Sequence, residues 1–158
     1  MATRGPRAEA GNKIRALEME KMSLEQLKSL KKQSDLEVNL LQDSLNKIRT
    51  AATRLEIAST ALHDLSLRPQ GKKLLVPLTA SLYAPGTLDD ADKVLVDVGT
   101  GYFIEKTITE GKDYCDRKIN LLKSNYEELI EMASKKKNIA DEAGMILQAK
   151  LRESSAST

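Results

Sequence analysis

Two long segments with the hydrophobic spacing of coiled-coil helices flank a short segment with the spacing of β-strands. The helical segments cover about residues 23–67 and 108–151, so they are almost equal in length. Equal arms joined by a short middle fold back on each other, which predicts an antiparallel coiled coil with both chain ends at one tip. Because such an object encloses no reaction pocket, the pattern favours grasping or assembly over catalysis.

The first helical segment has a regular seam with alternating spacings of three and four residues. Nine of the twelve seam positions are apolar: Leu24, Leu27, Lys31, Ser34, Val38, Leu41, Leu45, Ile48, Ala52, Leu55, Ser59 and Leu62. Ser23 and Gln26 have the spacing of a capping box, which predicts the start of the helix. Arg68 precedes Pro69, and the residue before a proline disfavours helical geometry, so the helix ends by about residue 67.

The second helical segment begins with another capping-box pair, Thr107 and Glu110. Its seam contains Cys115, Ile119, Leu122, Tyr126, Leu129, Ala133, Lys136, Ala140, Ala143, Leu147 and Lys150. We expect residues 152–158 to be a disordered tail. Residues 1–22 are predicted to be a disordered or partly helical extension, with disorder up to about residue 12 and a helical extension or an adhesive flap over 12–22.

The middle segment, residues 72–107, is predicted to form two β-hairpins. Residues 94–98 and 102–106 alternate with period two, and Gly99-Thr100-Gly101 joins them at hairpin distance. The other hairpin is predicted from strands at 74–78 and 80–83, with a type II turn at residues 84–87. Pro77 removes one donor from the ladder and favours an edge or bulged position.

Four short strands are too little sheet to be stable alone, and open edges normally become paired or covered. The middle segment is therefore predicted to complete a sheet with neighbouring subunits. The residues predicted to mediate oligomerisation are Leu75, Val76, Leu78, Leu82, Tyr83, Val94, Val96, Val98, Tyr102 and Ile104. On this interpretation Val96→Asp blocks assembly.

The chain carries no recognisable catalytic, cofactor-binding or metal-binding constellation. Its 25 basic and 23 acidic residues are evenly mixed, which is typical of solvated helix faces and not of a nucleic-acid footprint. One histidine, His63, and one cysteine, Cys115, cannot build a zinc site. The acidic residues of the 89–92 loop are expected to form a solvated turn. No stretch has the length and apolar character of a membrane span, so we expect a soluble, intracellular protein.

The strings LLVPLTASLYAPGTL and KVLVDVGTGYFIEKT closely resemble the hairpin region of α-class prefoldin subunits. The resemblance covers roughly residues 20–130. It implies a mainly α fold with a small β segment: a long antiparallel two-helix coiled coil whose two hairpins join an oligomeric β-barrel platform. It also implies an ATP-independent, cofactor-free co-chaperone that is not an enzyme.

The same resemblance implies partners. They are one further α-class and four β-class prefoldin subunits, unfolded actin and tubulin as clients, and the cytosolic group II chaperonin. Neither nucleic acid nor a membrane is implied, and the implied location is the cytoplasm, with the nucleus as a second location.

The seam weakens toward the predicted tip, where polar or small residues replace the larger apolar ones of the middle. Such a seam packs less strongly, so we expect this end to splay and to expose apolar side chains to a client. The predicted client-binding residues are Leu17, Met19, Met22, Leu24, Leu27, Met145, Ile146 and Leu151. Two other functions remain open: a structural coiled-coil tether, and a prefoldin-like subunit of a nuclear assembly.

Overall fold

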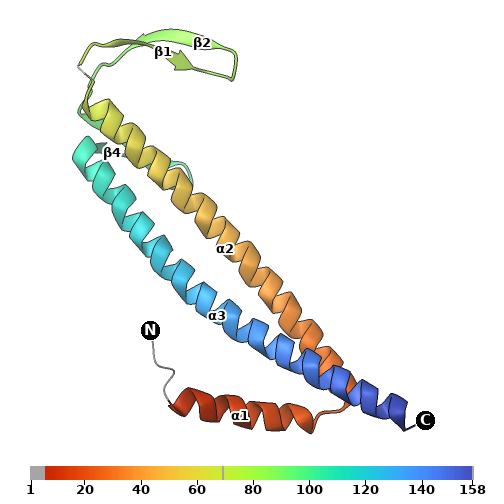
Figure 1. Cartoon of the computed structure of the whole chain (residues 1–158). Coiled ribbons are helices and arrows are strands. Elements are labelled where there is room, and N and C mark those ends of the chain that lie inside the picture. The colour runs from red at the N-terminus through yellow and green to blue at the C-terminus, as the bar shows by residue number, and fades with distance from the viewer. Residues whose placement is uncertain (1–5, 69, 158) are drawn as a thin grey trace. The chain divides into compact units, whose positions relative to one another are not determined.

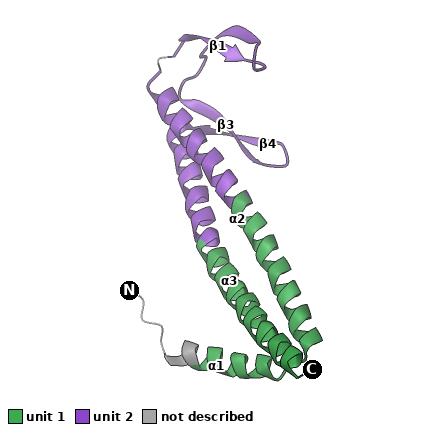
Figure 2. Ribbon diagram, turned by 45° about the vertical axis from the view of Figure 1, so that its right-hand side comes forward, with its two compact units in different colours: residues 1–46, 127–158 green, residues 47–126 purple. Residues whose placement is uncertain are grey.

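The computed structural model describes residues 6–68 and 70–157, which form three helices and four strands. Their order is α1 (Pro6–Glu20), α2 (Leu24–Ser66), β1 (Lys73–Pro77), β2 (Tyr83–Thr87), β3 (Lys93–Gly99), β4 (Tyr102–Thr107) and α3 (Ile108–Ala156) (Figure 1). The chain divides into two compact units, one of residues 1–46 and 127–158 and one of residues 47–126 (Figure 2). Helices α2 and α3 each contribute to both units. The predicted mainly α fold with two small hairpins is confirmed.

In the first unit the beginning of α2 packs against the end of α3 in antiparallel orientation. Lys136 forms an ion pair with Glu37 at 2.5 Å, and a Cβ on Gly144 would lie 3.2 Å from Cε of Lys31. The interior contains seam residues that the sequence pattern identified: Leu27, Ser34, Leu45, Ala140 and Ala143 are all buried. The small side chains of α3 at positions 140 and 143 let the two helices approach closely.

Helix α2 begins with the predicted capping box. The Ser23 N–H donates to Oε1 of Gln26 at 2.9 Å, and the Gln26 N–H donates to Oγ of Ser23 at 3.2 Å. These two bonds satisfy backbone donors that a helix terminus otherwise leaves free. Three residues, 21–23, separate α2 from α1.

The second unit joins the end of α2, both hairpins and the beginning of α3. Helix α3 starts with its own capping box, in which the Glu110 N–H donates to Oγ1 of Thr107 at 3.2 Å. The buried apolar residues of the second unit are Ala91, Ile108, Cys115 and Ile119. Away from the hairpins, the Arg49 guanidinium donates to the Tyr126 hydroxyl at 2.6 Å and lies over the same ring.

The β3–β4 hairpin has the predicted turn. Thr100 and Gly101 lie between Gly99 and Tyr102, and both have the positive φ that a type I′ turn requires. The register shifts between Asp97 and Gly99, and the Asp97 carboxylate accepts a bond from the Gly99 N–H at 2.9 Å. This local bond holds the bulge.

The β1–β2 hairpin corrects one prediction. Residues 84–87, predicted as a type II turn, are extended and belong to β2, where Pro85 pairs with Leu75. The actual turn covers residues 79–81. There the Thr79 hydroxyl accepts bonds from the backbone N–H groups of Ser81 and Leu82, so a threonine side chain supplies the turn that the Pro-Gly pair was expected to supply.

Both chain ends are more helical than predicted. Helix α3 continues through Ala156, where residues 152–158 were expected to be disordered, and in its last turns the Ser154 hydroxyl donates to the Leu151 carbonyl. Helix α1 starts at Pro6, a residue suited to the first position of a helix, so the helix begins earlier than residue 12. The predictions for residues 1–5 and 158 lie outside the described residues.

Candidate functional site

The β1–β2 hairpin presents apolar residues on both faces. The pairing register places Leu74 and Val76 on one face and Leu75 and Tyr83 on the other. Because the hairpin has only two strands, both of its edges are open, and Leu75 on one face is 66% exposed. The predicted oligomerisation residues Leu75, Val76, Leu78, Leu82 and Tyr83 are all exposed, as a surface awaiting a partner requires.

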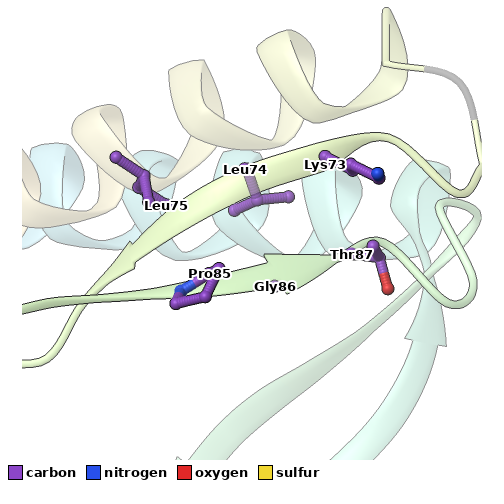
Figure 3. A pocket seen from close by; sticks show the side chains of 6 residues that line it. All are labelled: Lys73, Leu74, Leu75, Pro85, Gly86 and Thr87. Carbon is purple, nitrogen blue, oxygen red and sulfur yellow. The ribbon is translucent and has the colours of Figure 1, made fainter.

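An open groove of about 570 Å³ lies along this hairpin (Figure 3). It is lined by Lys73, Leu74, Leu75, Pro85, Gly86 and Thr87. Gly86 allows the strands to pack tightly, since a Cβ there would lie 3.1 Å from Cγ2 of Val76. The groove has apolar walls and one lysine at its end, and it suits a packed side chain of another protein better than a reacting substrate.

The free edges of this hairpin are interrupted by prolines. The Leu78 N–H donates to the Leu82 carbonyl, and the Leu88 N–H donates to the Lys72 carbonyl. Bonded and non-bonded pairs alternate in an antiparallel ladder, so Pro77 and Pro85 fall at positions whose N–H would point outward. The prediction that Pro77 takes an edge position is confirmed.

The β3–β4 hairpin has two different faces, and this corrects part of the predicted surface. Val94 and Val96 are half-buried on the face toward the chain's own helices, where a Cβ on Gly111 would lie 3.3 Å from Cγ2 of Val94. The opposite face exposes Leu95 at 70% and Phe103 at 60%. The residues predicted to mediate oligomerisation did not include these two, because strict alternation shows that two faces exist but not which one the helices cover.

The remaining predicted residues of this hairpin are exposed. Val98, Tyr102 and Ile104 lie near its turn and are accessible. On the outer face, Lys93 forms an ion pair with Glu105 at 2.9 Å, and this carboxylate raises the pKa of Lys93. The outer face of this hairpin therefore carries the exposed apolar side chains of Leu95 and Phe103 together with the Lys93–Glu105 ion pair.

In the first unit, the predicted client-binding residues divide into three groups according to their exposure. Met19 and Leu27 are buried, with exposed fractions of 2% and 0%, so they are not accessible in this structure. Met22, Leu24 and Ile146 are half-buried. The exposed members are Leu17, Met145 and Leu151. The prediction of a splayed, accessible end is thus wrong for Met19 and Leu27.

Met19 and Leu27 are buried because they belong to a cluster that includes α1, which we call the distal cluster. Met19 from α1, Leu27 from α2 and Ala143 from α3 form its buried centre. Around them pack Met22, Leu30, Ile139, Ile146 and Leu147. The sequence pattern identified most of these residues as apolar and left open an adhesive flap over residues 12–22, but it did not indicate which residues of the helix pair this segment would contact.

The described residues offer little for catalysis. Within residues 6–68 and 70–157, no group of three His, Cys, Asp or Glu side chains is placed to hold a metal ion, and no helix is long and apolar enough to cross a membrane. Burial raises the pKa of the Cys115 thiol, which disfavours the reactive thiolate. His63 Nδ1 lies 3.5 Å from Nζ of Lys112, on exposed helix surfaces.

Comparison with known proteins decides the family. The sequence profile of the prefoldin subunit family matches residues 34–153. The chain belongs to the prefoldin family. Its two hairpins are those of an α-class prefoldin subunit, so the predicted resemblance is confirmed.

Several prefoldin sequences resemble the chain over most of its length. It is 74% identical to prefoldin subunit 5 of Arabidopsis thaliana, over 89% of this chain and 93% of that protein. It is 40% identical to prefoldin subunit 5 of Homo sapiens, over 82% of this chain and 84% of that protein. A subunit of the filamentous prefoldin of Methanocaldococcus jannaschii has the same fold, with a TM-score of 0.63 at 19% identity, over 83% of this chain and 99% of that one.

Proposed function

We propose that this prefoldin subunit assembles with one further α-class and four β-class subunits into an ATP-independent co-chaperone. The complex holds unfolded actin and tubulin and passes them to the cytosolic group II chaperonin. Large apolar side chains that stay exposed on the hairpins carry this proposal, because a soluble chain normally covers such residues with a partner. We also propose that it acts in the cytoplasm, which cell fractionation with an antibody to the chain tests.

Assembly is tested on the outer face of the β3–β4 hairpin. Leu95→Asp and Phe103→Asp place a charge where a partner would cover an apolar side chain, so we expect loss of the hexamer. Leu121→Asp is the matched control, since Leu121 is also exposed and belongs to the same unit but lies on α3. Native mass spectrometry with the other five subunits reads out the complex.

Val96→Asp is no longer a clean test of assembly, because Val96 is half-buried in the chain itself. If the Leu95→Asp and Phe103→Asp chains enter the hexamer as well as the Leu121→Asp chain does, this hairpin is not the assembly surface. If the wild-type chain stays alone in the presence of all five partners, the structural tether becomes the better interpretation.

Client binding is tested with residues that are accessible in the structure. Met145 and Leu151 are exposed near the end of α3, and replacing both with serine removes apolar area without disturbing the distal cluster. We expect the assembled complex to suppress aggregation of chemically unfolded actin about two- to fivefold less well, as for the loss of one partly buried side chain. Leu121→Ser is the control, and equal suppression by both complexes would refute this contact.

A further inference from the structure

Among the side chains of α1 that the structure describes, residues 10–20, Met19 is the one that is buried in the rest of its unit. It is 2% exposed, whereas Ile14 and Leu17 on the same helix are 59% and 57% exposed. Figures 1 and 2 both show α1 meeting the helix pair only at the end that leads into α2. The helix is therefore held near its C-terminal end, and Ile14 and Leu17 face solvent.

The place that Met19 occupies includes a small residue of α3. Ala143 is buried there, and Leu27, Leu30 and Ile139 supply larger apolar walls. Small side chains leave a hollow between helices that one flexible side chain can fill. Methionine is well suited to filling such irregular gaps, and other apolar side chains of similar volume can replace it.

The polar contacts that hold α1 are few and partly exposed. Nε of Arg15 donates to Oε2 of Glu142 at 3.4 Å, and both side chains remain about a third exposed. Nζ of Lys150 donates to the Met22 carbonyl. Partly exposed ion pairs contribute little to stability, and a 15-residue helix is marginal by itself, so α1 can leave the helix pair without unfolding the rest.

We propose that the distal cluster contains a binding subsite for one apolar side chain of an unfolded client, and that Met19 is its resident occupant. A client side chain of the methionine or leucine type displaces Met19, and α1 swings away on the residue 21–23 connection. This inference rests on the proposed client-holding function and specifies how that site is regulated. Its consequence is that α1 competes with the client.

The first test compares two serine substitutions in α1. Met19→Ser removes the occupant, whereas Leu17→Ser removes a similar apolar side chain that faces solvent. Each full-length variant is assembled with its partner subunits and titrated with fluorescent, reduced and carboxymethylated α-lactalbumin, which stays unfolded. If α1 is closed about nine-tenths of the time, Met19→Ser lowers the apparent Kd about tenfold. Leu17→Ser leaves it unchanged or raises it.

A second test keeps Met19 and locks α1 in place. Arg15→Cys and Glu142→Cys, in a Cys115→Ala background, are joined by a short bis-maleimide, and the uncoupled double variant is the control. We expect the locked complex to bind the probe more weakly than the control. Trypsin gives an independent reading, because the probe should accelerate cleavage after Arg15 and Lys21 in the wild-type chain.

These outcomes separate the inference from the function on which it rests. Binding by the wild-type complex, with no gain in Met19→Ser and no loss on locking, refutes the subsite and leaves the holding function intact. If no complex binds the probe, both proposals fail. Circular dichroism of each variant shows whether the helices remain formed. If Met19→Ser proves unstable, the comparison of the cross-linked complex with its uncoupled control still tests the subsite.

Discussion

At the scale of single residues, the two glycines of α3 have different reasons to be there. A Cβ on Gly111 would lie 3.2 Å from Cδ1 of Leu62 and 3.3 Å from Cγ2 of Val94, two packed apolar side chains. A Cβ on Gly144 would meet only the flexible stem of Lys31. The sequence predicts that both glycines weaken the helix, but only the structure shows that Gly111 lets α3 approach α2 and β3.

Gly144→Ala should therefore raise the free energy of unfolding by about 0.5–1 kcal/mol, because alanine is the better helix former and Lys31 can move aside. Gly111→Ala should be neutral or destabilising, since the propensity gain is offset by crowding of packed side chains. Urea unfolding followed by circular dichroism measures both values. A larger gain from Gly111→Ala than from Gly144→Ala would contradict this account.

At the scale of elements, pattern and capping signals predicted the helices well, and the hairpins less completely. Both capping boxes and the Gly99–Gly101 turn act locally, so the sequence alone reveals them. The β1–β2 turn was misplaced because the Pro-Gly pair is compatible with an extended edge strand as well as a turn. The faces of β3 were undetermined because coverage by α3 depends on tertiary packing.

The cap of α3 gives a prediction at this scale. Thr107 is both the last residue of β4 and the cap of α3, and its hydroxyl accepts the Glu110 N–H at 3.2 Å. Thr107→Ala should lower the free energy of unfolding by about 1 kcal/mol through loss of this bond. Thr107→Ser, which keeps the hydroxyl, should retain most of it, and equal losses in a urea titration would exclude the cap as the cause.

At the scale of the whole molecule, each unit has a small core and keeps much of its apolar surface exposed. The second unit buries Cys115 but leaves large apolar side chains of both hairpins exposed, so its stability should rise when the proposed partners cover them. The sequence indicates exposed strand edges because these follow from local pattern. It does not indicate the covering of Met19, because the contact joins α1 to a part of α3 that is far away in sequence.

The reactivity of Cys115 can measure whether the binding of partner subunits to the hairpins stabilises the core of the second unit. The pKa of Cys115 is raised by burial, so the folded chain holds a proton that the unfolded chain releases at lower pH. The stability that depends on the buried neutral thiol is fully present below the ordinary cysteine pKa and is lost as pH rises through the folded value. Iodoacetamide should therefore modify the native chain slowly at neutral pH and faster at alkaline pH.

Assembly with partner subunits should slow this modification further, by up to about 100-fold when the partners are at 100 times their dissociation constant. The chain in urea is the control for intrinsic thiol reactivity. Mass spectrometry of the labelled peptide gives the rates. Equal rates for the free and the assembled chain would show that the hairpins and the Cys115 core are not coupled.

Pro77 and Pro85 occupy ladder positions whose N–H would point outward, and this matters in a newly made chain that has not yet bound its partners. A bare two-stranded sheet with apolar faces is a template on which identical chains stack into fibrils, each edge bonding to the next copy. Pro77 and Pro85 remove one donor from each edge, so such stacking is interrupted at every layer. These prolines should make the edges of the β1–β2 hairpin poorer templates for pairing with identical chains before the partner subunits bind.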